Sequence, residues 1–150
     1  MSTWQLRVGA VQLCSTHDLS ANLARCAELT AQAAAEGAQL VVLPECFSFL
    51  GRHEGDKLAI AEALDGRGPV MSTLRELATK HGVWILGGGT PELVRGDNKR
   101  TYNTAVTIDP RGELVARYRK IHLFDVEIPG GAVLRESDGT AAGDELVVVD

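Results

Sequence analysis

The chain has 150 residues, of which 45% are hydrophobic, and a formal net charge of -5. This length and composition are sufficient for one globular domain with its own core. The basic residues are scattered, which argues against a nucleic-acid surface, and no apolar stretch approaches the roughly 18 residues of a membrane helix. The N-terminal residues lack a secretory-signal pattern, so we expect a cytoplasmic protein that binds neither nucleic acid nor membrane.

The first part of the chain predicts a strand, a helix and a second strand. Leu6–Leu13 is short, apolar and rich in β-branched residues, as in a buried strand. Apolar positions then recur at helical spacing over Asp18–Glu36, with Asp18 as N-cap and a glycine after the last turn. Leu40–Leu43 predicts the second buried strand. A unit of this kind places its two strands parallel, with a right-handed crossover.

The remainder predicts a mixed sheet whose two long helices pack on a single face. The expected elements are a short helical piece at Leu58–Leu64, a helix at Val70–His81, a strand at Val83–Leu86, a β-hairpin of Thr101–Asp109 and Leu114–Arg119, and a strand at Glu145–Val149. Gly87–Gly89 is interpreted as a tight turn, because no phosphate-loop pattern surrounds it. The last strand is either an edge strand or part of a longer domain, and we favour the second interpretation.

Two charged residues stand directly after predicted strands. Glu45 follows Leu40–Leu43, at the position where open α/β sheets bind ligands; the alternative is a loop glutamate that caps a turn. Lys120 follows the second strand of the hairpin, and the apolar residues of Ile121–Ile128 predict that the segment is buried. A buried ammonium needs a carboxylate partner or a catalytic function, whereas the alternative is a solvated lysine at a sheet edge.

Three motifs carry a resemblance to a known family. They are LVVLPE at Leu40–Glu45, YNT at Tyr102–Thr104 and YRKIHLFDVEIPG at Tyr118–Gly130. Together they resemble the nitrilase, or carbon-nitrogen hydrolase, superfamily, and the match runs from Ala10 to Leu146 with the motifs in the family's order. HLFDVEIPGG followed by RES at Arg135–Ser137 is most similar to the Nit branch, whose members include deaminated glutathione amidases and omega-amidases.

The resemblance implies an α/β fold, a nitrilase-like α-β-β-α sandwich with a mixed sheet, of which residues 1–150 form the N-terminal half. It implies an amidase that cleaves a small-molecule amide, either deaminated glutathione or an omega-amide of a keto acid, through a Glu-Lys-Cys triad and a thioester, without a cofactor or metal. Glu45 matches the general base, Lys120 the lysine that stabilises the tetrahedral intermediate, and Glu136 a glutamate that positions substrate and base. A homodimer is expected for the full-length form.

The family's nucleophile motif, similar to GxxICYDxRFPE, is not present in this chain. Cys14 and Cys26 are interpreted as small core residues. Cys46 adjoins Glu45, but consecutive side chains after a strand tend to point apart, and the carboxylate raises a thiol's pKa. We therefore expect no nucleophile and no amidase turnover in this chain alone. The alternative function is a binding or assembly module that keeps the hydrolase-like sheet. The cysteines and histidines also lack metal-ligand spacing.

Overall fold

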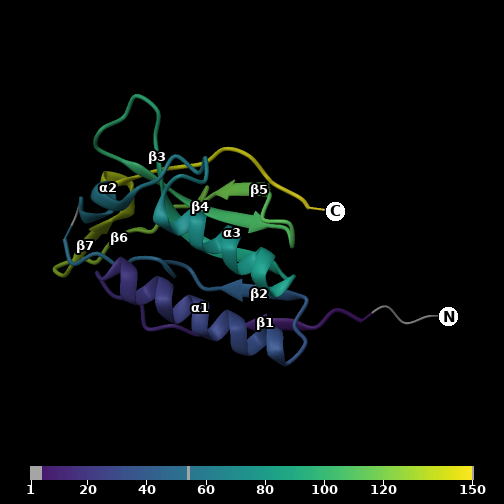
Figure 1. The fold of residues 1–150 in the computed structure, drawn as a ribbon. Helices are drawn as coiled ribbons and strands as arrows, with labels where there is room; N and C mark the ends of the chain where they lie inside the picture. The colour runs from purple at the N-terminus through teal and green to yellow at the C-terminus, as the bar shows by residue number, and fades with distance from the viewer. Residues whose placement is uncertain (1–4, 54, 150) are drawn as a thin grey trace.

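The computed structural model describes residues 5–53 and 55–149 and is organised around a mixed six-stranded sheet (Figure 1). Its elements are β1 (Val8–Ala10), α1 (Leu19–Ala35), β2 (Leu40–Leu43), α2 (Asp56–Ile60), α3 (Pro69–His81), β3 (Trp84–Leu93), β4 (Thr101–Ile108), β5 (Leu114–Arg119), β6 (Asp125–Glu127), β7 (Val133–Arg135), a 3-10 turn (Glu136–Asp138) and β8 (Thr140–Ala141). The strand order is β1-β2-β3-β4-β5, with β8 beside β4. β1, β2 and β3 are mutually parallel, whereas β4 is antiparallel to both β3 and β5.

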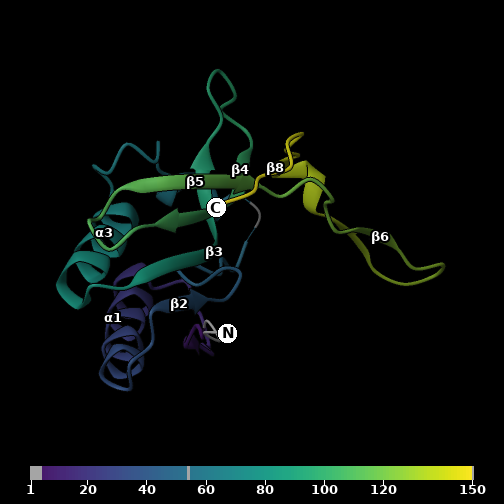
Figure 2. The same cartoon turned by 90° about the vertical axis from the view of Figure 1, so that its right-hand side faces the viewer.

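The two long helices lie on the same face of the sheet, as the sequence predicts (Figure 2). Asp18 accepts a hydrogen bond from the backbone N–H of Ala21 at 3.0 Å and so caps α1 as predicted. α3 begins at Pro69, and a residue that precedes the helix in sequence caps its first turn. The buried carboxylate of Glu62 accepts hydrogen bonds from Val70 N at 2.6 Å and Met71 N at 3.1 Å. The core between helices and sheet holds fully buried residues, among them Leu74, Ile85, Val106 and Ile108.

The glycine triplet is not a tight turn, so that prediction was wrong. β3 runs through Gly87–Gly89, and its pairing with β4 shifts register between Gly87 and Thr90. A side chain at Gly88 would collide with the backbone carbonyl of Leu43 on β2. The glycines therefore allow close approach of neighbouring strands and an irregularity in the ladder, not a reversal of the chain.

Three further strand and helix predictions need correction. Residues 145–149 belong to no strand and pair with neither edge strand of the sheet, β1 or β5, within the part of the chain described. A β-branched composition favours a strand only where a neighbour supplies the ladder. The helical piece expected at Leu58–Leu64 is displaced to α2, and the expected strand at Leu6–Leu13 is limited to β1.

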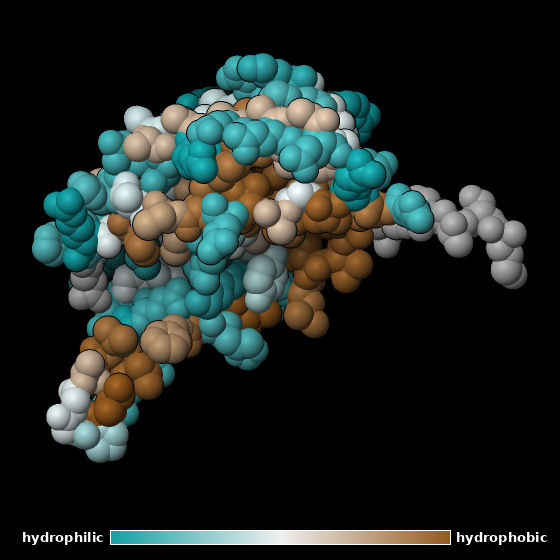
Figure 3. All heavy atoms as spheres, turned by 90° about the horizontal axis from the view of Figure 1, so that it is seen from below, coloured by the Kyte–Doolittle hydropathy of each residue, from teal (hydrophilic) through white to brown (hydrophobic). Residues whose placement is uncertain are grey.

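Sequence reasoning missed a two-stranded antiparallel ribbon, β6–β7, which projects from the body of the molecule (Figure 2). The segment after Lys120 was expected to be buried, but Phe124 is 60% exposed and Ile128 53% exposed. Burial was therefore the wrong inference from these apolar residues. Figure 3 shows apolar atoms gathered on the arm that extends beside the main body.

The sheet face opposite the helices carries no helix over it within the described residues. An open cavity of ≈ 600 Å³ lies on this face, lined by Leu6, Leu40, Trp84, Leu86, Ala105, Thr107, Ala116, Tyr118, Val147 and Val149. The extended residues 145–149 contribute two of these side chains, and Figure 3 shows apolar atoms gathered on this side. None of the described helices has the length and apolar character needed to cross a membrane.

Candidate active site

The sheet brings Glu45 and Lys120 together although 75 residues separate them. Lys120 Nζ lies 3.3 Å from Glu45 Oε1. The strands that carry the two residues are not neighbours, since β3 and β4 lie between β2 and β5. β5 runs in the same direction as β2, because it is antiparallel to β4, which is itself antiparallel to β3. The carboxyl ends of β2 and β5 therefore share one edge of the sheet.

Lys120 is held between two carboxylates. Besides Glu45, its ammonium donates to Glu136 Oε2 at 3.0 Å. Its backbone N–H donates to the carbonyl of Asn103, and its carbonyl accepts from Gly143 N, both at 2.9 Å. Partial burial on its own lowers the pKa of Lys120, but the hydrogen bond and charge of Glu136, together with Glu45, outweigh it and raise that pKa above its ordinary value. The ammonium is consequently charged at neutral pH.

Glu136 is anchored by the base of the projecting ribbon. Its Oε2 accepts the backbone N–H of Phe124 at 2.7 Å, next to the lysine hydrogen bond. Asp125 fixes the following turn by accepting from Ser137 N at 3.0 Å and Ser137 Oγ at 2.6 Å. Burial alone raises the pKa of Glu136. The hydrogen bond from the Phe124 N–H and the hydrogen bond and charge of Lys120 outweigh burial, so the net pKa lies below its ordinary value. Glu136 is thus a carboxylate that holds Lys120 in place.

Asn103 is a member of the site to which sequence reasoning assigned no role. Its Nδ2 donates to Glu45 Oε1 at 2.7 Å, so the same oxygen accepts from both Asn103 and Lys120. Gly89 makes room for this contact, because its φ is 151° and a Cβ there would collide with Asn103 Oδ1. The signal was available, since Asn103 is the central residue of the YNT motif.

The charged residues face an open cleft of ≈ 600 Å³. It is lined by Glu45, Cys46, Lys57, Lys120, Phe124, Val133, Leu134, Arg135, Glu136, Asp138 and Gly139. A narrower cavity of ≈ 80 Å³ adjoins it, lined by Glu45, Cys46, Phe49, Lys57, Gly89, Pro91, Thr101, Tyr102, Asn103 and Glu136. Across residues 5–53 and 55–149, no group of three potential metal-ligating side chains is assembled.

Comparison with known proteins identifies the family. The carbon-nitrogen hydrolase family pattern matches residues 7–150. The chain belongs to the carbon-nitrogen hydrolase family. It is 38% identical over 148 residues to a deaminated glutathione amidase of Dictyostelium discoideum, and the alignment covers 96% of this chain and 51% of that protein. The mouse deaminated glutathione amidase is 40% identical over 150 residues, with 97% of this chain and 45% of the mouse protein covered.

Solved structures agree with this assignment. The Caenorhabditis elegans NitFhit protein superimposes with a TM-score of 0.84 at 34% identity, covering 93% of this chain and 34% of that one. An amidase from Nesterenkonia sp. AN1, solved after Michael addition of acrylamide at its active site cysteine, gives a TM-score of 0.73 at 25% identity, covering 94% of this chain and 51% of that one. The chain has the nitrilase fold and spans about half the length of the curated relatives it matches.

The chain contains three free cysteines in different surroundings. Cys26 is fully buried in the core as predicted, and burial raises its pKa to about 11. Cys14 is exposed, so its prediction as a core residue was wrong. Cys46 was expected to point away from Glu45, yet both residues line the same cavities. The backbone of Cys46 is left-handed, with φ 57°. Burial and then the charge of Glu45 raise the pKa of the Cys46 thiol, which disfavours its reactive thiolate.

Proposed function

We propose that the protein to which this chain contributes is an amidase that hydrolyses the carbon–nitrogen bond of a small-molecule amide. The observation that carries the proposal is a charged lysine held between two carboxylates, at 3.3 Å from Glu45 and 3.0 Å from Glu136, in the wall of an open cleft. Family membership supports the reaction class. The names of the relatives favour deaminated glutathione as substrate, with an omega-amide of a keto acid as the other member of this class.

In the proposed mechanism Lys120 provides the positive charge. A cysteine thiolate attacks the amide carbonyl carbon, and the carbonyl oxygen becomes an oxyanion that the Lys120 ammonium stabilises. The raised pKa of Lys120 suits this function, because the residue keeps its proton through the reaction. Glu136 positions the ammonium and neutralises part of its charge in the resting site.

Glu45 is the proposed general base and acid. Its side chain is 55% exposed towards the cleft, so a substrate or thiol can reach it. It takes the proton of the thiol and delivers it to the departing nitrogen when the carbon–nitrogen bond breaks and ammonia leaves. Water then attacks the thioester, again with Glu45 as base, which releases the carboxylic acid and the free thiol. Asn103 orients the carboxylate through its 2.7 Å hydrogen bond.

We infer that the nucleophile comes from sequence beyond residues 1–150, and that these residues are the N-terminal part of the hydrolase domain. Cys46 is a poor candidate because burial and Glu45 raise its pKa. The structural neighbour from Nesterenkonia has an active site cysteine, and only 51% of it is covered by this chain. A homodimer of the longer protein, located in the cytoplasm, belongs to the same proposal.

Ammonia release tests the proposal directly. Deaminated glutathione, 2-oxoglutaramate and aliphatic amides are incubated with the 150-residue chain and with a longer protein that continues beyond residue 150. We expect turnover from the longer protein only. Lys120→Ala and Glu45→Gln in that protein should each reduce kcat/KM by roughly 100-fold or more, whereas exposed Lys80→Ala should not.

Three results would contradict parts of this assignment. Undiminished activity in both Lys120→Ala and Glu45→Gln would refute the residue roles. Activity of the 150-residue chain that disappears in Cys46→Ser would place the nucleophile at Cys46. A longer protein that binds amides but releases no ammonia would establish the non-catalytic binding module instead.

A further inference from the structure

A second lysine lies in the wall of the candidate site and forms no ion pair with a carboxylate of the residues that the structure describes. Lys57, on α2, lines both the cleft and the ≈ 80 Å³ cavity and is only partly exposed. Its Nζ donates to Thr140 Oγ1 at 2.9 Å. Lys120 is neutralised by Glu45 and Glu136, but within the described residues no carboxylate oxygen lies within 4.0 Å of the Lys57 ammonium. Glu136 lines the same cavities and feels the charge of Lys57, but Lys57 makes no direct ion pair with a described residue.

Two buried threonine hydroxyls lie beside this lysine. Thr101 and Thr140 are paired residues of the parallel strands β4 and β8, so their side chains lie on the same face, and each is 1% exposed. Thr140 Oγ1 accepts from Lys57, which orients the ammonium. Thr101 lines the small cavity, and its Oγ1 has no hydrogen-bond partner among the residues described. An unsatisfied buried hydroxyl costs about 1–3 kcal/mol, so a ligand that accepts its proton would remove a penalty.

The chemistry and size of this corner define a ligand class. An ammonium and a free hydroxyl are both hydrogen-bond donors, which together favour an anionic acceptor. A volume of ≈ 80 Å³ corresponds to about two or three water molecules at roughly 30 Å³ each. A carboxylate group fits such a space. Glu45 and Glu136 also line this cavity, and Lys57 together with Lys120 offsets the repulsion that their negative charges would exert on a carboxylate.

We propose that Lys57 and Thr101 form a subsite that binds a carboxylate carried by the substrate, with Thr140 positioning the lysine. The inference rests on the proposed amidase function and deepens it by naming the residues that bind the carboxylate which both candidate substrates carry. Lys57 is then a specificity-determining residue and not part of the bond-breaking machinery.

Binding of glutarate to the 150-residue chain, measured by calorimetry near pH 7, tests the subsite without turnover. Lys57→Met should weaken binding about tenfold or more, the matched control Lys80→Met should have no effect, and Lys57→Arg should recover part of the affinity. Thr101→Val removes a hydroxyl that has no protein partner in the described structure. It should weaken glutarate binding without lowering the melting temperature, which a merely structural threonine would lower. Equal affinity in Lys57→Met, or no binding to the unsubstituted chain at tens of millimolar, overturns the proposal.

Kinetics of the longer protein separate this inference from the proposed function. For Lys57→Met we expect KM for 2-oxoglutaramate, which carries a carboxylate, to rise about tenfold, and KM for neutral butyramide to stay within about twofold. Equal losses for both amides overturn the subsite and leave the amidase function in place. If the unsubstituted protein hydrolyses neither amide, the proposed function fails, and the glutarate measurement still decides whether Lys57 binds a carboxylate.

Discussion

At the scale of single residues, a buried ion pair next to Lys120 supports the site. Glu92 is 3% exposed and accepts from Arg119 Nε at 2.9 Å, from Arg119 Nη2 at 2.5 Å and from Thr104 Oγ1 at 2.7 Å. Arg119 also lies over the ring of Tyr102, 4.0 Å from its centroid. Because Arg119 directly precedes Lys120, this cluster fixes the end of β5 from which Lys120 extends.

Glu92→Gln should therefore destabilise the fold. The substitution leaves Arg119 without its bidentate partner, and we expect the free energy of unfolding to fall by about 3 kcal/mol. This value is at the low end of the range for a buried ion pair because Arg119 is 31% exposed. Urea denaturation measures the loss. Glu127→Gln is the control, since its pair with Arg135 is exposed and should be worth less than about 1 kcal/mol. Equal effects of the two substitutions would contradict the assigned importance of the buried pair.

The same carboxylate predicts how stability depends on pH. Burial alone raises the pKa of Glu92, but hydrogen bonds from Arg119 and Thr104 outweigh it and hold the pKa below the ordinary value of 4.5. A carboxyl with a lowered pKa in the folded state contributes its full stability above its unfolded pKa and loses it as the pH falls through the folded pKa. The free energy of unfolding should decrease below about pH 4.5, and more gently in Glu92→Gln. Urea titrations from pH 7 to pH 3 measure the slopes, and identical slopes would contradict the prediction.

At the scale of secondary structure, the glycine-rich middle of β3 determines how closely the site residues approach. Gly88 allows the end of β2 to lie against β3, and Gly89 leaves space for Asn103 beside Glu45. Side chains at these positions would push apart the strand ends that carry the site. The irregular pairing between Gly87 and Thr90 is thus a structural requirement of the cleft, consistent with the frequent occurrence of bulges near active sites.

Gly89→Ala tests this requirement. The new methyl group would collide with Asn103 Oδ1, so we expect Gly89→Ala to lower the free energy of unfolding by at least about 1 kcal/mol more than Gly96→Ala does. The side-chain amide signals of Asn103 should also shift in NMR spectra. Gly96 is a suitable control because its φ is also positive, at 81°, but nothing lies within 4 Å of a Cβ there. If both variants lose similar stability, the cause is the positive φ of the backbone and not a collision with Asn103.

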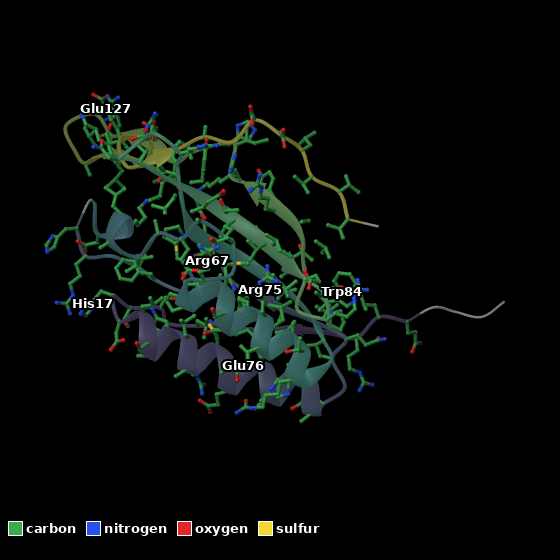
Figure 4. All side chains as sticks on the ribbon, turned by 45° about the horizontal axis from the view of Figure 1, so that its top comes forward. His17, Arg67, Arg75, Glu76, Trp84 and Glu127 are labelled. Carbon is green, nitrogen blue, oxygen red and sulfur yellow. The ribbon has the colours of Figure 1, made fainter. Side chains whose placement is uncertain are left out.

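At the scale of the whole molecule, the sheet has one covered and one uncovered face. The helices bury one side, while Trp84, Leu86 and Tyr118 line an open apolar cavity on the other. Figure 4 shows Trp84 at the end of the molecule opposite Glu127, which lies on the projecting ribbon. The uncovered face is therefore spread along the sheet and is not confined to the site edge. Contiguous apolar surface of this kind favours association.

The 150-residue chain should accordingly associate in a concentration-dependent manner. Leu86→Glu places a charge on the uncovered face and should shift the population towards monomer in sedimentation velocity experiments. Leu93→Glu makes the same change at a 46% exposed position that does not line this cavity, and should have little effect. A monodisperse monomer at high concentration for the unsubstituted chain would contradict the prediction. Circular dichroism confirms that each variant is folded.

The sequence by itself determined the elements whose signals are local. The N-cap at Asp18 and the apolar period that follows it define α1, and the turn between Thr101–Asp109 and Leu114–Arg119 defines the hairpin. Motifs also located Glu45, Lys120 and Glu136, because each lies in or beside a short run of recognisable residues. The predictions of α1 and of the hairpin were confirmed because capping, periodicity and turn chemistry depend on residues only a few positions apart. The roles of Glu45, Lys120 and Glu136 stay a proposal.

Only the tertiary structure decided which distant groups meet. Asn103 contacts Glu45 because β3 contains glycine where the two approach, and Lys57 meets Thr140 across 83 residues of sequence. The exposure of the ribbon and the unpaired state of residues 145–149 were likewise invisible to local patterns. Burial and strand pairing are properties of the surface that a segment meets, and the segment's own composition specifies that it is apolar but not what will cover it.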